Sequence, residues 1–477
     1  MPVAKSLEGS FAYADQLGQR PGAGAVYLNI FHYDVESFLD SKKVNADESL
    51  RLSTISTGLI IPDKFFELAK ENKQFYMFGP HSVYKEYGIE LDDMNIHEYY
   101  DDLVSNQNII KKSTGAREML NTIAQMQLQS GYPYLMFKDN ANKVHANSNI
   151  GQIKMSNLCT EILQLQETSI INDYDKNDDI KRDISCNLGS LNIVNVMESN
   201  KIKESVYIAM DALTAVSDES NINVAPGVKK ANEELHSVGL GVLNLNGYFA
   251  KNKIQYESEE AKDFANTFFM MMNYYSIKRS MQIAKERGET YKDFNKSTYA
   301  TGEYFNKYIT NSYTPKYNKI KELFKDMYIP TQSDWTELMK QVKEYGLFNA
   351  YRLAIAPTQS ISYVQNATSS VMPIVDQIER RTYGNAETFY PMPFLSPETM
   401  WYYKSAFNID QMNLIDLISV IQEHVDQGIS TILYVNSDIS TKELAKYYVY
   451  AHYKGLKSLY YTRNKLLSVE ECTSCAV

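Results

Sequence analysis

Short apolar runs alternate with longer mixed segments along most of this chain. The clearest runs are 26–31 (VYLNIF), 353–356 (LAIA), 431–435 (TILYV) and 456–461 (LKSLYY). Runs of this length that are rich in aliphatic, β-branched and aromatic side chains predict largely buried strands. Because such strands alternate with predicted helices, we expect an α/β fold with much parallel pairing, in an open sheet or a closed barrel.

The predicted helices are bounded by residues that favour helix ends. A Ser hydroxyl can accept a hydrogen bond from the first turn, and Gly adopts the left-handed conformation that ends a helix. The predicted start and stop pairs are Ser113 and Gly131, Ser258 and Gly288, Ser333 and Gly346, and Ser440 with Glu443 as a capping box and Gly455. The apolar run 268–272 (FFMMM) is followed by Asn273 and, further on, by Lys278 and Arg279, which predicts a buried helix.

Composition places the chain among globular proteins. Its 477 residues, 44% hydrophobic and 22% charged, are enough for several layers around a large core, as in one compact enzyme. A net charge of -10 argues against binding nucleic acid, because that function usually requires a basic face. We find no signal peptide and no window of about 18 apolar residues, which argues against a membrane protein. Four cysteines without a secretory signal predict the reducing cytoplasm.

The first cysteine lies in the heptapeptide Ser156-Asn157-Leu158-Cys159-Thr160-Glu161-Ile162. In an extended segment, alternate side chains point to the same side, so an amide and a carboxylate would flank the thiol. An acid-base group beside a thiol outlines a chemical site. A buried cysteine is more often a small inert hydrophobe, and the heptapeptide alone leaves both interpretations open.

The other cysteines favour redox chemistry. Cys186 follows Cys159 by 27 residues (186 minus 159), and Cys472 and Cys475 form a Cys-Thr-Ser-Cys motif near the last residue. A structural zinc site needs four ligands, and the seven histidines show no paired spacing that would supply the others. Dithiol exchange suits a terminal motif better, because exchange requires physical reach. A tail with two spare thiols is the alternative.

Two further stretches suggest nucleotide binding. Pro357-Thr358-Gln359-Ser360-Ile361-Ser362 follows an apolar run, and hydroxyl and N–H groups at a helix start suit a phosphate. An ordinary helix cap without a ligand is the alternative. Glycines 18, 22 and 24 lie in a loop before the first apolar run and permit close backbone approach, although the pattern is neither GxGxxG nor a Walker loop. A flexible turn is the alternative here.

Taken in order, these motifs resemble the large catalytic subunit of class I ribonucleotide reductase, closest to the class Ib ribonucleoside-diphosphate reductase alpha subunit. The resemblance runs from about Ser6 to the last residue. It is carried by 157–161 (NLCTE), Cys186 at its spacing, 356–362 (APTQSIS), 458–461 (SLYY) and the terminal CTSC. It implies a ten-stranded α/β barrel whose internal finger loop bears the reactive cysteine. We therefore expect a partial barrel domain at 1–465, surrounded by helices, and a flexible redox-active tail at 466–477.

The resemblance also implies a role for each motif residue. Cys159 would carry the thiyl radical that removes the ribose 3'-hydrogen, Glu161 would act on the 3'-hydroxyl, and Asn157 would orient the ribose hydroxyls. Cys186 would be half of the disulfide that forms on reduction, and Tyr460 and Tyr461 would relay the radical. Leu158 and Thr160 would lie beside the substrate, and its diphosphate would be held by Pro357, Thr358, Gln359, Ser360 and Ile361. An effector-responsive loop would contain Gly18, Arg20, Gly22 and Gly24. Cys472 and Cys475 would be the thiols that re-reduce the active site.

The implied activity is radical reduction of ribonucleoside diphosphates to 2'-deoxyribonucleoside diphosphates for DNA synthesis. A separate small subunit would generate a metal-tyrosyl radical, so we expect neither a covalently bound cofactor nor a metal site in this chain. Nucleotide effectors (ATP and deoxynucleoside triphosphates), a thioredoxin- or glutaredoxin-like reductant and a homo-oligomeric assembly are also implied. A glycyl-radical enzyme or an adenosylcobalamin-dependent reductase would not need the adjacent tyrosines, which argues against both.

The chain departs from the family pattern at its start. Before Cys159 it contains no cysteine that could pair with Cys186, and Met1 lies close to the effector-responsive loop. The family's N-terminal helical region and first strands would therefore be absent. We expect the C-terminal part of a split catalytic subunit that is active only with a separate N-terminal fragment. A truncated non-catalytic remnant, or a regulatory protein derived from the reductase, is the alternative.

Overall fold

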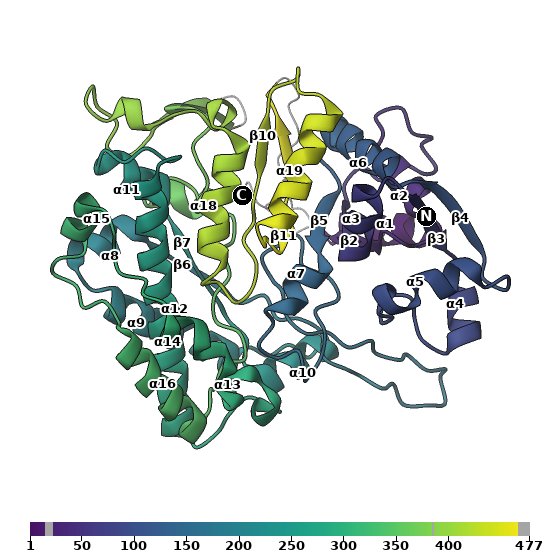
Figure 1. Ribbon diagram of the computed structural model, residues 1–477, viewed down its shortest axis with the longest axis horizontal. Helices are drawn as coiled ribbons and strands as arrows, with labels where there is room; N and C mark the ends of the chain where they lie inside the picture. Colours follow the sequence, from purple (N-terminus) through teal and green to yellow (C-terminus); the bar gives the residue numbers. More distant parts are fainter. Residues whose placement is uncertain (15–21, 384–385, 466–477) are drawn as a thin grey trace. The chain divides into compact units, whose positions relative to one another are not determined.

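The structure is a computed structural model that describes residues 1–14, 22–383 and 386–465. The chain forms two compact units. The first unit contains residues 1–141, 154–160 and the segment from 431 onward, and the second contains 142–153 and 161–430. Strands and helices alternate in both units (Figure 1), which confirms the predicted α/β class.

The first unit is built on a four-stranded sheet of order β1-β2-β5-β11. Strands β1, β2 and β5 are parallel, and β11 runs antiparallel to β5. Two smaller pairs are β3 with β4, antiparallel, and β10 with β12, parallel. The strands are β1 (Ala25–Asn29), β2 (Ser56–Ile61), β3 (Gln74–Phe78), β4 (Lys111–Gly115), β5 (Tyr134–Phe137), β10 (Leu433–Val435), β11 (Ser458–Leu459) and β12 (Thr462–Asn464).

Helices connect the strands of the first unit, because parallel neighbours need crossover connections. They are α1 (Pro2–Tyr13), α2 (Val35–Asp40), α3 (Asp63–Lys70), α4 (Pro80–Tyr87), α5 (Ile96–Ser105), α6 (Ala116–Ser130), α7 (Lys138–Lys143) and α19 (Thr441–Tyr453). Helix α6 packs against α3 and α19. Every residue of β2 and β5 is buried, as expected for the inner strands of a sheet.

The second unit contains a parallel ladder. Strand β6 (Leu188–Asn192) pairs with β7 (Gly239–Leu243), and parallel bridges continue from Leu240 to Leu353 and from Ile355 to Ile429. Strands β8 (Ile378–Tyr383) and β9 (Ala386–Pro391) form a separate antiparallel hairpin. The α-helices are α8 (Ile193–Ser199), α9 (Ile202–Glu219), α10 (Pro226–Leu235), α11 (Leu245–Lys251), α12 (Glu259–Arg287), α13 (Thr298–Thr301), α14 (Asn306–Thr310), α15 (Asn318–Leu323), α16 (Gln332–Tyr345), α17 (Gln359–Val364) and α18 (Gln411–Gln422). The short 3-10 helices are Phe294–Lys296, Glu303–Phe305, Met400–Tyr402 and Ala406–Asn408.

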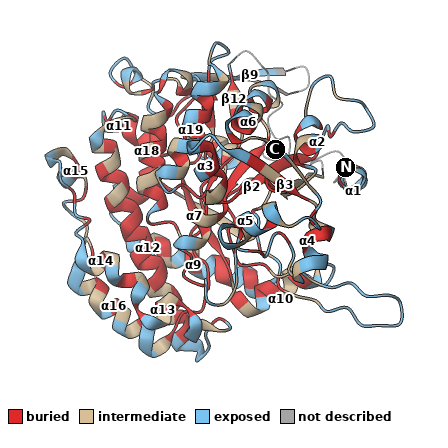
Figure 2. Cartoon of the chain, turned by 45° about the vertical axis from the view of Figure 1, so that its right-hand side comes forward, coloured by how far each residue is buried: buried red, intermediate tan, exposed pale blue. Residues whose placement is uncertain are grey.

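Helix α12 is the centre of the second unit's core. It packs against α9, α16 and α18 and is buried along most of its length (Figure 2). The predicted boundaries are confirmed: the Ser258 hydroxyl accepts the Ala261 N–H, and Gly288 ends the helix with φ +67°. The run 268–272 is buried within it, as predicted. None of the helices among the described residues has the length and apolar character needed to cross a membrane.

Two predicted helix starts are wrong. Ser113 lies inside β4, where it pairs with Tyr76, and α6 begins after Gly115. For α16, Thr331 rather than Ser333 is the N-cap, because Thr331 and Asp334 form a reciprocal capping box. Ser440 caps α19 by accepting the Glu443 N–H, which is one half of the predicted capping box; the Glu443 side chain does not accept the Ser440 N–H in return.

The predicted strands are found with shorter bounds. The run 26–31 overlaps β1, which begins one residue earlier at Ala25, and 431–435 and 456–461 contain β10 and β11. The run 353–356 forms only the isolated bridges of the parallel ladder. Residues 30 and 31 form a turn, and the ends of the other two runs are outside regular secondary structure.

A buried histidine gives the second unit a pH-dependent stability. Burial, and then the nearby Lys307 charge, hold the pKa of His424 well below 6.5, and its ring nitrogens contact Tyr308 Oη at 3.2 Å and Asn266 Oδ1 at 2.9 Å. The unfolded chain binds a proton at this residue below pH ~6.5, whereas the folded chain does not. Stability contributed by neutral His424 is therefore complete above that pH and lost as the pH falls.

We expect the stability difference between the natural chain and His424→Gln to shrink as the pH falls from 7 to 5, with a slope of at most about 1.4 kcal/mol per pH unit. Urea unfolding at several pH values measures it. His81, an exposed histidine on α4, offers the matched control His81→Gln, measured at the same pH values. A constant difference for His424→Gln would contradict the expectation.

Candidate active site

The segment that carries Cys159 is a turn rather than an extended strand. The Asn157 carbonyl accepts the Thr160 N–H at 3.4 Å, and Thr160 has φ +69°. The expectation that alternate side chains share one side of an extended segment is therefore wrong. A left-handed β-branched residue is strained by about 1–3 kcal/mol, so surrounding contacts must hold the turn.

Two hydroxyl groups of the first unit hold this turn. Tyr27, on β1, donates to the Asn157 carbonyl at 2.7 Å, and Ser458, on β11, donates to the Thr160 carbonyl at 2.9 Å. The Thr160 side chain is buried, and its hydroxyl has no hydrogen-bond partner among the described residues. The sheet thus fixes the backbone on both sides of Cys159.

Cys159 lies against Tyr460, whose ring contacts that of its neighbour Tyr461. The Tyr460 hydroxyl donates to the Cys159 sulfur at 3.6 Å, and the Tyr460 and Tyr461 ring centroids are 4.7 Å apart at 66°. Tyr460 is buried, whereas Tyr461 and Cys159 are half-buried. The first unit therefore brings together Cys159, Tyr460 and Tyr461 in an arrangement that allows hydrogen transfer between sulfur and a phenol.

Backbone pairing on two sides fixes the tyrosine pair. The Tyr460 N–H donates to the Thr431 carbonyl at 2.8 Å, and the Leu433 N–H donates to the Tyr461 carbonyl at 3.3 Å. On the other side, β11 pairs with β5, with Leu459 opposite Leu135. The pair is thus part of the sheet framework rather than of a mobile loop.

In the second unit, Glu161 is buried and its carboxylate has a hydroxyl donor. Ser430 donates to Glu161 Oε2 at 3.2 Å, and the Gly428 N–H donates to the Glu161 backbone carbonyl at 2.7 Å. The same segment joins the parallel ladder, because the Ser430 N–H donates to the Ile355 carbonyl. Residues 428–430 therefore fix both the position and the orientation of this carboxylate.

Cys186 is exposed. It follows Ser185, whose backbone is held by the buried side-chain amide of Gln164. The Gln164 side chain accepts the Ser185 N–H at 3.1 Å and donates to the Ser185 carbonyl at 3.0 Å. It also donates to Gln427 Oε1 at 3.0 Å. Gln164 thus ties the segment after Glu161 to the backbone that presents the Cys186 thiol.

The predicted phosphate-binding stretch forms the start of α17, as expected. Thr358 is the N-cap position, but its buried hydroxyl contacts Ser362 Oγ at 3.0 Å and accepts the Ser370 N–H at 2.7 Å. Its function is therefore to close the loop. Because the first N–H groups of a helix have no acceptor within it, an anion at this position would be bound by the backbone of Gln359, Ser360 and Ile361.

Glycines 22 and 24 lie where the backbone of the first unit comes close to α1. A Cβ atom on Gly24 would lie 2.3 Å from the Phe11 ring, and one on Gly22 would lie 2.1 Å from the Phe11 carbonyl oxygen. Close approach therefore requires glycine at both positions. Gly18 and Arg20, and Cys472 and Cys475 of the tail, lie outside the described residues.

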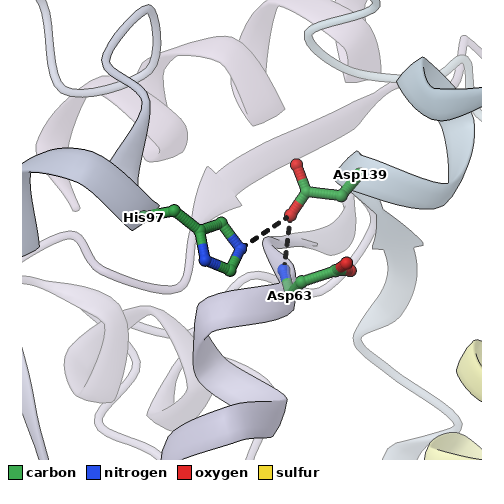
Figure 3. Close-up of side chains that lie close together, drawn as sticks. All are labelled: Asp63, His97 and Asp139. Carbon is green, nitrogen blue, oxygen red and sulfur yellow. Dashed lines mark hydrogen bonds and ion pairs between the residues drawn. The ribbon is translucent and has the colours of Figure 1, made fainter.

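Among the described residues of the first unit, one cluster of metal-ligating groups is present. Ligand atoms of Asp63, His97 and Asp139 lie within 4.8 Å of one another (Figure 3). Asp139 Oδ2 accepts the N–H of Asp63, the first residue of α3, at 2.5 Å and lies 3.7 Å from His97 Nε2, while Asp63 Oδ1 contacts His452 Nε2 at 2.7 Å. Two carboxylates and an imidazole suit a divalent cation. Their contacts also explain the cluster without one, as an N-terminal cap of α3 with ion pairs.

Sequence reasoning missed four residues that support these groups: Tyr27, Gln164, Ser430 and Ser458. Each is polar and buried or half-buried, and each contacts a segment distant in sequence or across a loop. A buried hydroxyl or amide requires a partner, so a Ser within an apolar run, as in 456–461, is the signal that could have indicated Ser458.

Comparison with known proteins identifies the family. The family model described as "Ribonucleotide reductase, barrel domain" matches residues 1–462. The chain is 53% identical to the ribonucleoside-diphosphate reductase subunit alpha of Bacillus subtilis over 475 residues, covering 100% of this chain and 68% of the relative. It is 41% identical to the protein of that name from Mycoplasma pneumoniae, again covering 100% and 68%, and 31% identical to that from Treponema pallidum, covering 97% and 54%. The first unit holds a thiol against Tyr460, and the second holds a buried, oriented carboxylate. By its match to the family model and to these relatives, the chain belongs to the ribonucleotide reductase family.

Proposed function

We propose that this chain reduces ribonucleoside diphosphates to 2'-deoxyribonucleoside diphosphates as part of a class I reductase alpha subunit. The observation that carries the proposal is the 3.6 Å contact between the Tyr460 hydroxyl and the Cys159 sulfur, next to the Tyr461 ring. The similarity to ribonucleoside-diphosphate reductases supports the substrate class. A separate small subunit would supply the oxidising equivalent as a tyrosyl radical.

In this proposal, the tyrosine pair delivers the radical to Cys159. The Tyr460 phenoxyl takes the hydrogen atom from the Cys159 thiol, which forms an O–H bond, breaks the S–H bond and leaves a thiyl radical. That radical takes the 3'-hydrogen of the ribose, and Asn157 orients the ribose hydroxyls. The short, fixed contact supports the step because hydrogen transfer requires the two atoms to lie within hydrogen-bonding distance.

Glu161 acts as the base for the 3'-hydroxyl, while the 2'-hydroxyl takes a proton from the thiol pair that includes Cys186 and leaves as water. The Ser430 hydroxyl stabilises the charged carboxylate and orients it, and burial keeps it from bulk water. Two electrons come from a pair of thiols that includes Cys186. Cys472 and Cys475 then re-reduce the resulting disulfide and are themselves re-reduced by a thioredoxin- or glutaredoxin-like protein.

The diphosphate is bound at the start of α17, by the stretch from Pro357 to Ile361. Leu158 and Thr160 contact the substrate through the turn at Cys159, and the loop that contains Gly18, Arg20, Gly22 and Gly24 responds to ATP or deoxynucleotide effectors. The helix N-terminus supports the phosphate role, since its N–H groups and dipole favour an anion. The tight packing of Gly22 and Gly24 against α1 supports a loop whose path is set by glycine.

The finer fold assignment is also proposed. The parallel pairs of β1, β2 and β5 and of β6 and β7 support a ten-stranded barrel domain at 1–465. Residues 144–187 contain no helix or strand longer than the bridge between Ile170 and Asp179. This segment would be the finger loop, and 466–477 the redox tail.

The assembly proposed for activity is larger than this chain. The Bacillus subtilis relative extends beyond the matched region, since the chain covers 68% of it. We propose that an N-terminal fragment supplies the remaining residues and that the complete alpha subunit forms a homo-oligomer that binds the small subunit. The test is formation of deoxycytidine diphosphate from cytidine diphosphate when the chain, that fragment, the small subunit and a dithiol are mixed. Absence of product from the complete mixture would favour the non-catalytic alternative.

Ser430→Ala should lower turnover by roughly 10- to 100-fold, because a hydrogen bond to a charged group contributes about 1.5–3 kcal/mol. The acidic limb of the pH–rate profile should also move to higher pH, since the charged form of Glu161 loses its hydroxyl donor. Ser419→Ala in α18, which removes a hydroxyl bonded to the Asp416 carbonyl at 2.8 Å, is the matched control. A Ser430→Ala profile identical to that of the control would contradict this role.

A further inference from the structure

Tyr460 has two tyrosine neighbours at the same distance. The ring centroids of Tyr460 and Tyr461 are 4.7 Å apart, and those of Tyr460 and Tyr134 are also 4.7 Å apart, at 50°. The radical path described above uses only Tyr461. An oxidised Tyr460 ring therefore has a second phenol within the same reach.

The strand register explains this placement. Strands β5 and β11 are antiparallel, with Ser458 opposite Met136 and Leu459 opposite Leu135. One step further along the same register places Tyr460 opposite Tyr134. Directly opposed side chains on neighbouring strands are close enough for aromatic contact, so the sheet itself fixes the pair.

Tyr134 is also connected through hydroxyl groups. Tyr134, which is 0% exposed, donates to Ser56 Oγ at 3.0 Å, and Ser56 donates to the Tyr132 hydroxyl at 3.3 Å. The ring centroids of Tyr132 and Tyr134 are 5.2 Å apart at 41°. Because each hydroxyl can both donate and accept, the direction of this chain of hydrogen bonds can reverse. Electron and proton thus have matching routes between Tyr134 and Tyr132.

A positive charge lies at the outer end of this route. The Lys42 ammonium is 4.6 Å from the centroid of the half-buried Tyr132 ring. A cation over an aromatic face is attracted to its electrons and therefore opposes removal of one of them. Oxidation of Tyr132 is thus disfavoured relative to that of Tyr134, which keeps the oxidising equivalent in the buried part of the route.

We propose that Tyr134 is a side branch of the radical path, in which the oxidising equivalent can reside next to Tyr460, with Tyr132 and Lys42 limiting its escape. The proposal rests on the proposed function of the tyrosine pair. In the first step, the Tyr460 phenoxyl is reduced and Tyr134 is oxidised. The Tyr134 O–H bond breaks, the Tyr460 O–H bond forms, and one electron and one proton move from Tyr134 to Tyr460.

The second step exchanges the radical between Tyr134 and Tyr132. One electron moves from the Tyr132 ring to Tyr134, the Tyr132 proton moves to Ser56 Oγ, and the Ser56 proton moves to Tyr134. The step conserves one electron and one proton, and Ser56 ends as a neutral hydroxyl. The Lys42 charge disfavours removal of an electron from Tyr132, so the radical should accumulate at Tyr134 rather than at Tyr132.

The test places 3-aminotyrosine, which is oxidised more easily than tyrosine, at single positions of the holoenzyme assembled with the small subunit. Electron paramagnetic resonance after substrate addition then reports where an aminotyrosyl radical forms. Position 460 tests the proposed function itself, and position 134 tests the branch. Position 100 is the control, because Tyr100 is also buried but its ring contacts phenylalanines, with centroids 5.6 Å from Phe31 and 5.9 Å from Phe78.

We expect aminotyrosyl signals from positions 460 and 134 and none from position 100. A signal from 460 without one from 134 overturns the branch and leaves the proposed function standing, whereas signals from neither overturn both. A signal from position 100 equal to that from 134 also overturns the branch, because oxidation of a tyrosine would then not depend on ring contact with Tyr460. Aminotyrosine at 132 should also give a signal, because it is oxidised more easily than the tyrosine it replaces. Ser56→Ala should cause loss of that signal, and an unchanged signal overturns the hydroxyl route.

Discussion

Cys159→Ser should lower deoxynucleotide formation by roughly 10³-fold or more, equivalent to about 4 kcal/mol added to the barrier. Serine has nearly the same shape, so it fits the turn that Tyr27 and Ser458 hold. Its O–H bond is stronger than the S–H bond of cysteine, so the Tyr460 phenoxyl cannot remove the hydrogen atom. The rate of deoxycytidine diphosphate formation by the complete assembly measures the loss.

The fold should not change with this substitution. The thermal unfolding midpoint of Cys159→Ser should stay close to that of the natural chain, because the replaced atom is half-buried and no apolar volume is removed. Substrate binding should also persist. Turnover by Cys159→Ser within tenfold of the natural chain would contradict a thiyl mechanism, whereas loss of the fold would leave turnover uninformative and would call for Cys159→Ala.

Tyr460→Phe should abolish turnover to a similar extent. The change removes one oxygen atom and leaves the ring contacts with Tyr461 and Tyr134 in place. Without the hydroxyl, no phenoxyl radical can form and no O–H group faces the Cys159 sulfur. Tyr460→Phe should therefore lose turnover while its free energy of unfolding changes little.

Tyr100→Phe is the matched control for that loss. Tyr100 is a buried tyrosine of the same unit, and its hydroxyl accepts the Tyr76 N–H at 3.1 Å. Its removal should cost about 0.5–1.5 kcal/mol of stability and leave turnover unchanged. Equal activity losses in the two variants would indicate general disruption rather than radical transfer through Tyr460.

Local sequence patterns predicted the elements better than their boundaries. Ser258 and Gly288 mark α12 because both end signals act within one turn of the helix they bound. Ser113 was misleading because the β3–β4 pairing, a contact between distant segments, takes precedence over a local capping preference. Thr331 was missed because a reciprocal contact with Asp334 determines the cap.

The site shows the same limit more strongly. The heptapeptide around Cys159 was recognisable, but its alternation could not reveal a turn with Thr160 at positive φ. The partners that orient it come from far along the chain: Tyr460 is 301 residues from Cys159, and Ser430 is 269 residues from Glu161. Such pairs depend on strand register, which single-sequence patterns do not determine.

The resemblance to a known family assigned roles that residue patterns left open. Adjacent tyrosines are a weak signal in a chain with 37 of them, and the structure gives Tyr460 a contact with the Cys159 sulfur. Tyr134 carried no signal of its own in the sequence. Its position next to Tyr460 follows from the pairing of β5 with β11 and could be identified only from the structure.

The central claim is that Cys159 breaks the ribose C3'–H bond during turnover. The most direct measurement uses cytidine diphosphate labelled with tritium at C3' and with carbon-14 in the base, and follows the isotope ratio of the unreacted substrate. If the claim is right, unreacted substrate becomes enriched in tritium as deoxycytidine diphosphate forms, because the heavier bond breaks more slowly. A constant ratio during product formation would contradict it.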